Sequence, residues 1–148
     1  MNEDVFHLGV KALIRNKSGK FLLLKENTVG WKNVMEPFWD MPGGRIHRGE
    51  DLEVALRREV FEETGIRDFA IADRLQMTFS KYRIPAGDSG LDIDVGVILS
   101  TYVCDIATDV EIMLSDESLE WGWFTASEAG QMLGVRYSKE FMDEVGEL

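Results

Sequence analysis

The amino-acid sequence predicts an α+β fold in which a β-sheet dominates and one helix occupies the middle of the chain. Short apolar runs bounded by turn residues recur in both halves of the chain, as expected for strands. Only residues 50–64 and two short stretches near the end carry helix signals. The 148 residues contain no internal repeat and no interdomain linker. We therefore expect a single domain over residues 1–148.

The first half of the chain should begin with a hairpin. Residues 5–15 largely alternate apolar and polar side chains, and residues 21–24 form a second apolar run after an Asn-Lys-Ser-Gly turn cluster. An irregular loop over residues 27–37 then leads to a short apolar segment at residues 38–41.

The central helix should run from about Glu50 to Thr64. Acidic residues at positions 50, 51 and 53 favour its N-terminus, because helix N-termini carry partial positive charge. Gly65 suits the left-handed conformation that commonly ends a helix.

The second half of the chain should add strands and two short helices. Aliphatic, β-branched and aromatic residues predict strands over residues 69–82 (with a polar break at 72–74), 92–104 and 119–124. Residues 85–90 form a loop between the first two of these. Thr125 and Glu128 fit a capping box that opens a helix ending near residue 133, and a short terminal helix should cover residues 138–145.

The net charge of the chain limits the classes of partner that it can bind. A formal net charge of −11 argues against a nucleic-acid polymer, because such binding needs a basic surface. It does not exclude a small phosphorylated substrate, since a bound metal ion can mask the charge locally. The alternative is that the acidity only keeps the surface soluble.

Cysteine content and hydropathy indicate a cytoplasmic protein. Cys104 is the single cysteine, so an intramolecular disulfide is excluded, and its apolar surroundings indicate a packing role rather than catalysis. No apolar run approaches the roughly 20 residues of a membrane span. The acidic N-terminus does not resemble a signal peptide.

Three carboxylates share one face of the predicted central helix. Glu59, Glu62 and Glu63 stand at positions i, i+3 and i+4, and about 3.6 residues make one turn. Like charges at this spacing repel each other, so the helix needs a compensating cation. Oxygen-only ligands favour Mg²⁺ or Mn²⁺ over zinc. The alternative is a solvated helix end with ordinary ion pairs, such as one between Arg58 and Glu62.

The apolar pattern places these carboxylates toward the body of the protein. Glu59 and Glu63 fall on the same side as the apolar stripe, which consists of Leu52, Ala55, Leu56 and Val60. Val54 and Phe61 lie on the far side, so we expect the helix to be covered on two faces. The preceding Pro42-Gly43-Gly44 segment would let backbone approach a ligand closely, although it also fits a plain turn.

Residues 44–66 resemble the Nudix box, G-x5-E-x7-R-E-U-x-E-E-x-G-U, where U is a bulky aliphatic residue. Every fixed position is filled, by Gly44, Glu50, Arg58, Glu59, Val60, Glu62, Glu63, Gly65 and Ile66. Chain length and strand order also resemble the MutT-like Nudix fold, an α/β/α sandwich on a mixed β-sheet. The resemblance implies an enzyme that hydrolyses a pyrophosphate bond in a nucleoside diphosphate linked to another group.

The resemblance also implies roles for individual residues. The metal ligands would be Glu59, Glu62, Glu63 and the Gly44 carbonyl, holding Mg²⁺ or Mn²⁺, with more than one ion once substrate is bound. Arg58 would orient the carboxylates, and Glu50 would be a supporting carboxylate or secondary ligand.

Further residues resemble positions that act on the phosphates in some members of the family. Arg45 and Lys25 would contact phosphate groups. Glu59 is the first choice for the general base, and Glu117 is the alternative, unless Glu117 belongs to an ordinary acidic loop.

The nucleotide itself is less constrained by the sequence. Trp31 and Tyr82 are candidates for stacking on a base, although core packing would also explain them. We rank nucleoside triphosphates first, dinucleoside polyphosphates second because of Tyr82, and nucleotide sugars third. Pro85 comes late for an ADP-ribose hydrolase. A nucleotide sensor without activity is the alternative from another class. Exposed strand edges would permit a homodimer, which nothing in the sequence specifies.

Overall fold

The computed structural model describes residues 2–148, so Met1 of the expected domain lies outside the described residues. This part of the chain forms eight strands, three α-helices and one 3₁₀ helix. The strands are β1 (Phe6–Arg15), β2 (Phe21–Glu26), β3 (Trp39–Asp40), β4 (Gly43–Arg45), β5 (Ala70–Arg74), β6 (Thr78–Phe79), β7 (Gly96–Asp105) and β8 (Ser118–Phe124). The helices are α1 (Leu52–Thr64), α2 (Ala126–Met132), the 3₁₀ helix η1 (Leu133–Val135) and α3 (Lys139–Gly146).

The strands form one mixed sheet with the central order β3-β2-β1-β7-β5. β1 and β7 run parallel along their whole length, from Phe6 opposite Gly96 to Arg15 opposite Asp105. The other pairings between strands are antiparallel, with β4 beside β1, β6 beside β7 and β8 beside β2. The sheet thus combines a hairpin at its start with a parallel crossover at its centre.

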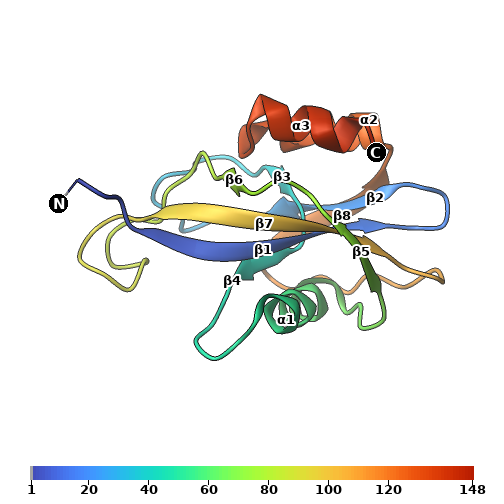
Figure 1. Cartoon of the computed structure of the whole chain (residues 1–148), viewed down its shortest axis with the longest axis horizontal. Helices are drawn as coiled ribbons and strands as arrows, with labels where there is room; N and C mark the ends of the chain where they lie inside the picture. Colours follow the sequence, from blue (N-terminus) through green and yellow to red (C-terminus); the bar gives the residue numbers. More distant parts are fainter. Residues whose placement is uncertain (1) are drawn as a thin grey trace.

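Helices cover both faces of the sheet. Figure 1 shows α1 on one side and α2 with α3 on the other. The sheet face under α1 packs Leu22 and Leu24 against Leu56 and Val60 of the helix. The opposite face buries Tyr137 and Phe141 with β1 and β2 side chains such as Leu13, Phe21 and Leu23. The expected α/β/α sandwich on a mixed sheet is confirmed.

Helix α1 begins at Leu52, two residues later than the prediction. The Asp51 side chain caps it by accepting a hydrogen bond of 2.8 Å from the Val54 N–H. Gly65 ends the helix in the left-handed conformation, at φ 78°, and its N–H donates to the Phe61 carbonyl.

The expectation that α1 is covered on two faces is wrong. Val54 is 53% exposed and Phe61 is 40% exposed, so the far side of the helix is open; of the apolar stripe, Ala55, Leu56 and Val60 are buried and Leu52 is exposed. Instead of packing under a second layer, the Phe61 ring lies 3.9 Å from the Arg67 guanidinium in a cation–π contact.

The predicted strands at residues 69–82 and 92–104 differ most from the structure. The polar residues 72–74 belong to β5, which has a register shift between Ile71 and Asp73, and the interruption falls at residues 75–77. Strand β7 begins at Gly96 rather than residue 92, and only Val95 forms an isolated bridge, with Ile84. Tyr82 therefore lies outside regular strand. No helix within residues 2–148 is both long and apolar enough to cross a membrane.

Candidate active site

A cavity of about 570 Å³ lies beside β1, which pairs with β2 near one end and with β4 further along. β1 pairs with β2 at Arg15 and with β4 at residues 9–11. The wall beside α1 carries Glu59, Glu62 and Glu63 together with Gly43 and Gly44. The remainder of the lining includes Lys11, Glu26, Trp31, Arg45, Arg58, Tyr82, Arg83, Glu117 and Arg136. This volume falls within the range of about 300–1,000 Å³ that is typical of ligand pockets.

The two glycines of β4 let the strand backbone touch the carboxylates of α1. A Cβ atom on Gly44 would stand 2.7 Å from the carboxylate carbon of Glu59. The Gly43 N–H donates a hydrogen bond of 2.6 Å to Glu63 Oε2. The two glycines are therefore needed for the close contact between β4 and the α1 carboxylates, which a plain turn before the helix would not explain.

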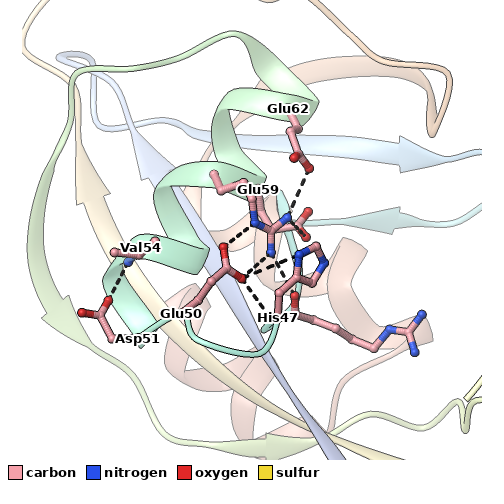
Figure 2. Close-up of polar contacts among 8 residues, drawn as sticks. His47, Glu50, Asp51, Val54, Glu59 and Glu62 are labelled. Atoms are coloured by element: carbon pink, nitrogen blue, oxygen red, sulfur yellow. Dashed lines mark hydrogen bonds and ion pairs between the residues drawn. The ribbon is translucent and has the colours of Figure 1, made fainter. Parts of the chain in front are cut away.

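Arg58 holds the acidic side chains in place. Its guanidinium binds Glu50 in a bidentate manner, with Nε to Oε2 at 2.6 Å and Nη2 to Oε1 at 2.9 Å. Nη1 also donates to Glu59 Oε1 at 2.8 Å and to Glu62 Oε2 at 3.3 Å, and Nη2 donates to the Arg45 carbonyl. Figure 2 shows Glu50, Glu59 and Glu62 directed toward this one guanidinium.

Glu50 binds Arg58 and does not line the cavity. Its Oε1 also accepts a hydrogen bond from the His47 N–H at 2.8 Å, and Glu50 is not among the cavity-lining residues. The Arg58 hydrogen bonds lower the pKa of Glu50 to about 2, so this carboxylate stays ionised. The geometry supports the predicted supporting role of Glu50 more than that of a direct ligand.

Two further carboxylates are buried beside the cavity. Burial raises the pKa of Glu63 to about 8, although the nearby Lys11 charge and the Gly43 N–H act in the opposite direction. Burial likewise raises the pKa of Glu26, which is 7% exposed, to about 7. A buried carboxylate is costly unless a proton or a cation neutralises it. Sequence reasoning missed Glu26; the signal was an acidic residue two positions after the apolar run of residues 21–24.

The donor set suits a hard divalent cation. The α1 wall offers carboxylate and carbonyl oxygens, which are the ligands that Mg²⁺ and Mn²⁺ prefer. Glutamates also outnumber the basic side chains at this wall, so it can balance the charge of a divalent cation. Within residues 2–148, no group of three or more His, Cys, Asp or Glu side chains is already arranged to hold a metal ion. Arg58 and the Gly43 N–H engage the same oxygens instead. The residues fit a divalent ion, with a local rearrangement of the Arg58 contacts.

The structure brings most of the other predicted site residues to the cavity. Arg45, Glu117, Trp31 and Tyr82 all line it. The rings of Trp31 and Tyr82 both contact Phe38, at centroid distances of 5.7 and 5.5 Å.

Lys25 is the exception. It is not among the cavity-lining residues, and its Nζ lies 3.8 Å from Glu120 Oε2 on the neighbouring strand β8. Leu24 already faces the core under α1, so the next side chain along β2 points to the other face. This geometry does not support the predicted phosphate contact of Lys25.

Sequence reasoning also missed a buried polar cluster formed by Lys11, Asp40, Arg136 and Tyr137. Asp40 is fully buried and accepts hydrogen bonds from Lys11 Nζ at 3.0 Å, Arg136 Nη1 at 2.8 Å and the Tyr137 hydroxyl at 2.7 Å. Lys11 and Arg136 also line the cavity. The only local signal was a lysine in the middle of an apolar strand.

Comparison with known proteins identifies the class to which this fold and site belong. The model of the NUDIX domain family matches residues 5–145, and this chain belongs to that family. It is a Nudix hydrolase, of the MutT and NudI type.

Individual relatives agree with this assignment. The nucleoside triphosphatase NudI of Salmonella typhimurium is 30% identical over 117 residues, which cover 78% of this chain and 79% of that protein. A Bacillus subtilis relative is 42% identical over 57 residues, and the match spans only 34% of its length.

Solved structures show the same fold. The MutT protein from Methanosarcina mazei Go1 superposes with a TM-score of 0.73 and 28% identity, covering 99% of this chain and 97% of that one. An Ap4A hydrolase of C. elegans gives a TM-score of 0.70 over 93% of each chain, at 19% identity. The latter similarity concerns the fold alone.

Proposed function

We propose that this chain is a Mg²⁺- or Mn²⁺-dependent pyrophosphohydrolase that converts a nucleoside triphosphate to the monophosphate and pyrophosphate. The observation that carries the proposal is the composition of one cavity, which joins the α1 carboxylates and Gly44 at one wall to Trp31 and Tyr82 elsewhere in its lining. A triphosphate needs cations and a base needs an aromatic surface, and this cavity has room for both. The name of NudI, a nucleoside triphosphatase, supports the same substrate class.

The residues of the cavity have distinct tasks in this reaction. Glu59, Glu62, Glu63 and the Gly44 carbonyl would hold the divalent ion. When bound, the ion neutralises phosphate charge and lowers the pKa of the attacking water. Arg58 keeps Glu59 and Glu62 within reach of one another through Nη1 contacts of 2.8 and 3.3 Å.

The chain must also supply a base and bind the phosphates. Glu59 is the first candidate to accept the proton of the attacking water, because it lies against Gly44 in the cavity wall. Glu117 is the second, since it lines the same cavity from the loop before β8. Arg45, which is exposed at the rim, would contact the leaving phosphates.

One other substrate class has an observation in its favour. Tyr82 lines the cavity, as expected for a dinucleoside polyphosphate hydrolase, so diadenosine polyphosphates are the second candidate. Cys104 is buried and free, which fits the cytoplasmic location that we include in the proposal.

The experiment is hydrolysis of a nucleotide panel in Mg²⁺, Mn²⁺ or EDTA, with products separated by ion exchange. The panel contains canonical and oxidised nucleoside triphosphates, diadenosine polyphosphates, ADP-ribose and nucleotide sugars. Metal-dependent release of monophosphate and pyrophosphate from triphosphates is the expected result. A triphosphate released only from dinucleosides would replace the first substrate class with the second.

A pair of variants on α1 separates catalysis from folding. The Glu62 side chain is 53% exposed, so Glu62→Gln should leave the fold intact and reduce kcat by about 100-fold or more, as losses of catalytic charge stabilisation do. The matched control is Glu53→Gln, because Glu53 is 60% exposed on the same helix and pairs with Arg57 outside the cavity. Binding of nucleotide without turnover on any substrate would favour a sensor instead.

A further inference from the structure

Arg136 lines the cavity but has no role in the metal binding and hydrolysis proposed above. Its side chain is 15% exposed and lines the cavity. Its hydrogen-bond partners lie in β3 and in the segment that leads to Tyr82: Nε donates to Ser80 Oγ at 2.9 Å, and its carbonyl accepts from the Lys81 N–H at 2.9 Å. Arg136 is therefore linked to the Tyr82 segment, and none of its hydrogen bonds within residues 2–148 goes to the α1 glutamates.

The buried polar cluster fixes the orientation of this guanidinium. Nη1 donates to Asp40, whose carboxylate is itself held by Lys11 and Tyr137. With Nε bound to Ser80, two edges of the planar group are anchored. No residue in 2–148 accepts a hydrogen bond from Nη2. Nη2 is not one of the buried atoms left without a partner, so it is accessible from the cavity that Arg136 lines, where it can donate to an acceptor on a ligand.

The surroundings indicate which part of a nucleotide supplies that acceptor. The phosphates belong with the metal-binding glutamates and Gly44, whereas Tyr82 and Trp31 offer faces for a base. Arg136 reaches the Tyr82 segment through Ser80 and Lys81. A guanidinium donates only, so it favours a carbonyl oxygen on the base edge and disfavours an amino group at the same position.

We propose that Arg136 selects the base, so that substrates with an oxo group at purine C6 or pyrimidine C4 are preferred over those with an amino group. The proposal rests on the proposed function, because it concerns the nucleoside triphosphate in the same cavity. Arg136 is a specificity-determining residue in this view, and the buried polar cluster holds it in position.

The first test needs only the unmodified protein. ITP is compared with ATP, and UTP with CTP, because each pair differs at the carbonyl or amino group in question. We expect kcat/KM to be about 10- to 100-fold higher for the oxo member of each pair, the range of one good base contact. Equal values within each pair would overturn the inference.

Two variants assign the preference to Arg136. In Arg136→Lys, which keeps the charge beside Asp40 but loses the planar fork, the oxo preference should fall to within about threefold. In Ser80→Ala, which leaves the buried ion pair intact, the preference should weaken by about three- to tenfold, because the guanidinium loses one anchor and the Tyr82 N–H loses its acceptor. An equal loss for all four nucleotides would mean a phosphate contact or a structural role, and would overturn the inference.

A control and a binding assay keep the two proposals separate. Arg74→Lys, at an exposed position of β5 outside the cavity lining, should not change any ratio. Calorimetric binding of the same four nucleotides in Ca²⁺ is measured in parallel. Selective binding of ITP and UTP without hydrolysis would refute the proposed function and support the inference. Hydrolysis without base preference would support the proposed function and refute the inference about Arg136.

Discussion

Replacing Asp40 with asparagine tests the buried polar cluster as a source of stability. Asp40 is 0% exposed, and its oxygens accept from Lys11, Arg136 and Tyr137 at 2.7–3.0 Å. Asparagine keeps the size of the side chain but removes its charge. Lys11 and Arg136 would then remain buried without their counter-ion.

The expected destabilisation is large. Removing one partner of a buried ion pair costs about 3–5 kcal/mol. For a domain of this length, each kcal/mol lowers Tm by roughly 2–4 °C, so Tm should fall by roughly 6–20 °C. Burial raises the pKa of Asp40, but the charges of Lys11 and Arg136 outweigh this and lower the pKa below 3.8. Its contribution is therefore complete above about pH 4 and is lost as the pH falls through the lower folded value.

Urea denaturation at neutral and acidic pH measures both effects. The control is Asp105→Asn, because the Asp105–Arg15 pair has a similar contact of 2.7 Å but side chains 34–40% exposed. An exposed pair should contribute about 0–1 kcal/mol. If Asp40→Asn cost no more than this control, or if the difference between wild type and Asp40→Asn did not narrow on acidification, the reasoning about the cluster would be refuted.

Three further predictions concern other parts of the molecule. Glu50→Gln should destabilise the protein at neutral pH, and the difference from wild type should shrink below about pH 4, since the Arg58 contact lowers the pKa of Glu50 to about 2; a constant difference in chemical-denaturation curves would contradict this. Gly44→Ala should weaken Mn²⁺ binding about tenfold or more, because the new Cβ would stand 2.7 Å from the Glu59 carboxylate; unchanged Mn²⁺ titration by electron paramagnetic resonance would contradict it. Cys104, whose pKa burial raises to about 12, should react with a thiol reagent at pH 8 at least about 100-fold more slowly in the native protein than in urea; comparable rates would rule out this burial.

Local sequence patterns predicted much of the fold. The capping box of Thr125 and Glu128 is present, and Gly65 ends α1 as expected, because caps depend on residues within one helical turn. The bounds of β5 and β7 were less accurate, since strand ends depend on pairing partners far along the chain.

The carboxylate wall of the site was equally accessible from the sequence. Glu59, Glu62 and Glu63 line one cavity because a helix brings positions i, i+3 and i+4 to one side. The glycine pair before the helix predicted that backbone would approach a ligand closely, and in the structure Gly44 lies this close to the Glu59 carboxylate. Spacing alone was sufficient for the three glutamates, because positions i, i+3 and i+4 lie within about one turn of a helix, whereas the approach of Gly44 to Glu59 also depends on how β4 packs against α1.

Only the tertiary structure decided the rest of the site. Asp40 and Arg136 are 96 residues apart in sequence and meet because β3 lies in the sheet while the segment after η1 returns over it. Glu26 lines the cavity and Lys25 does not, which depends on the direction of each side chain at the end of β2. A sequence shows that such charges exist. Sheet register and helix packing determine which of them are buried together, and hence which can hold a metal ion or select a base.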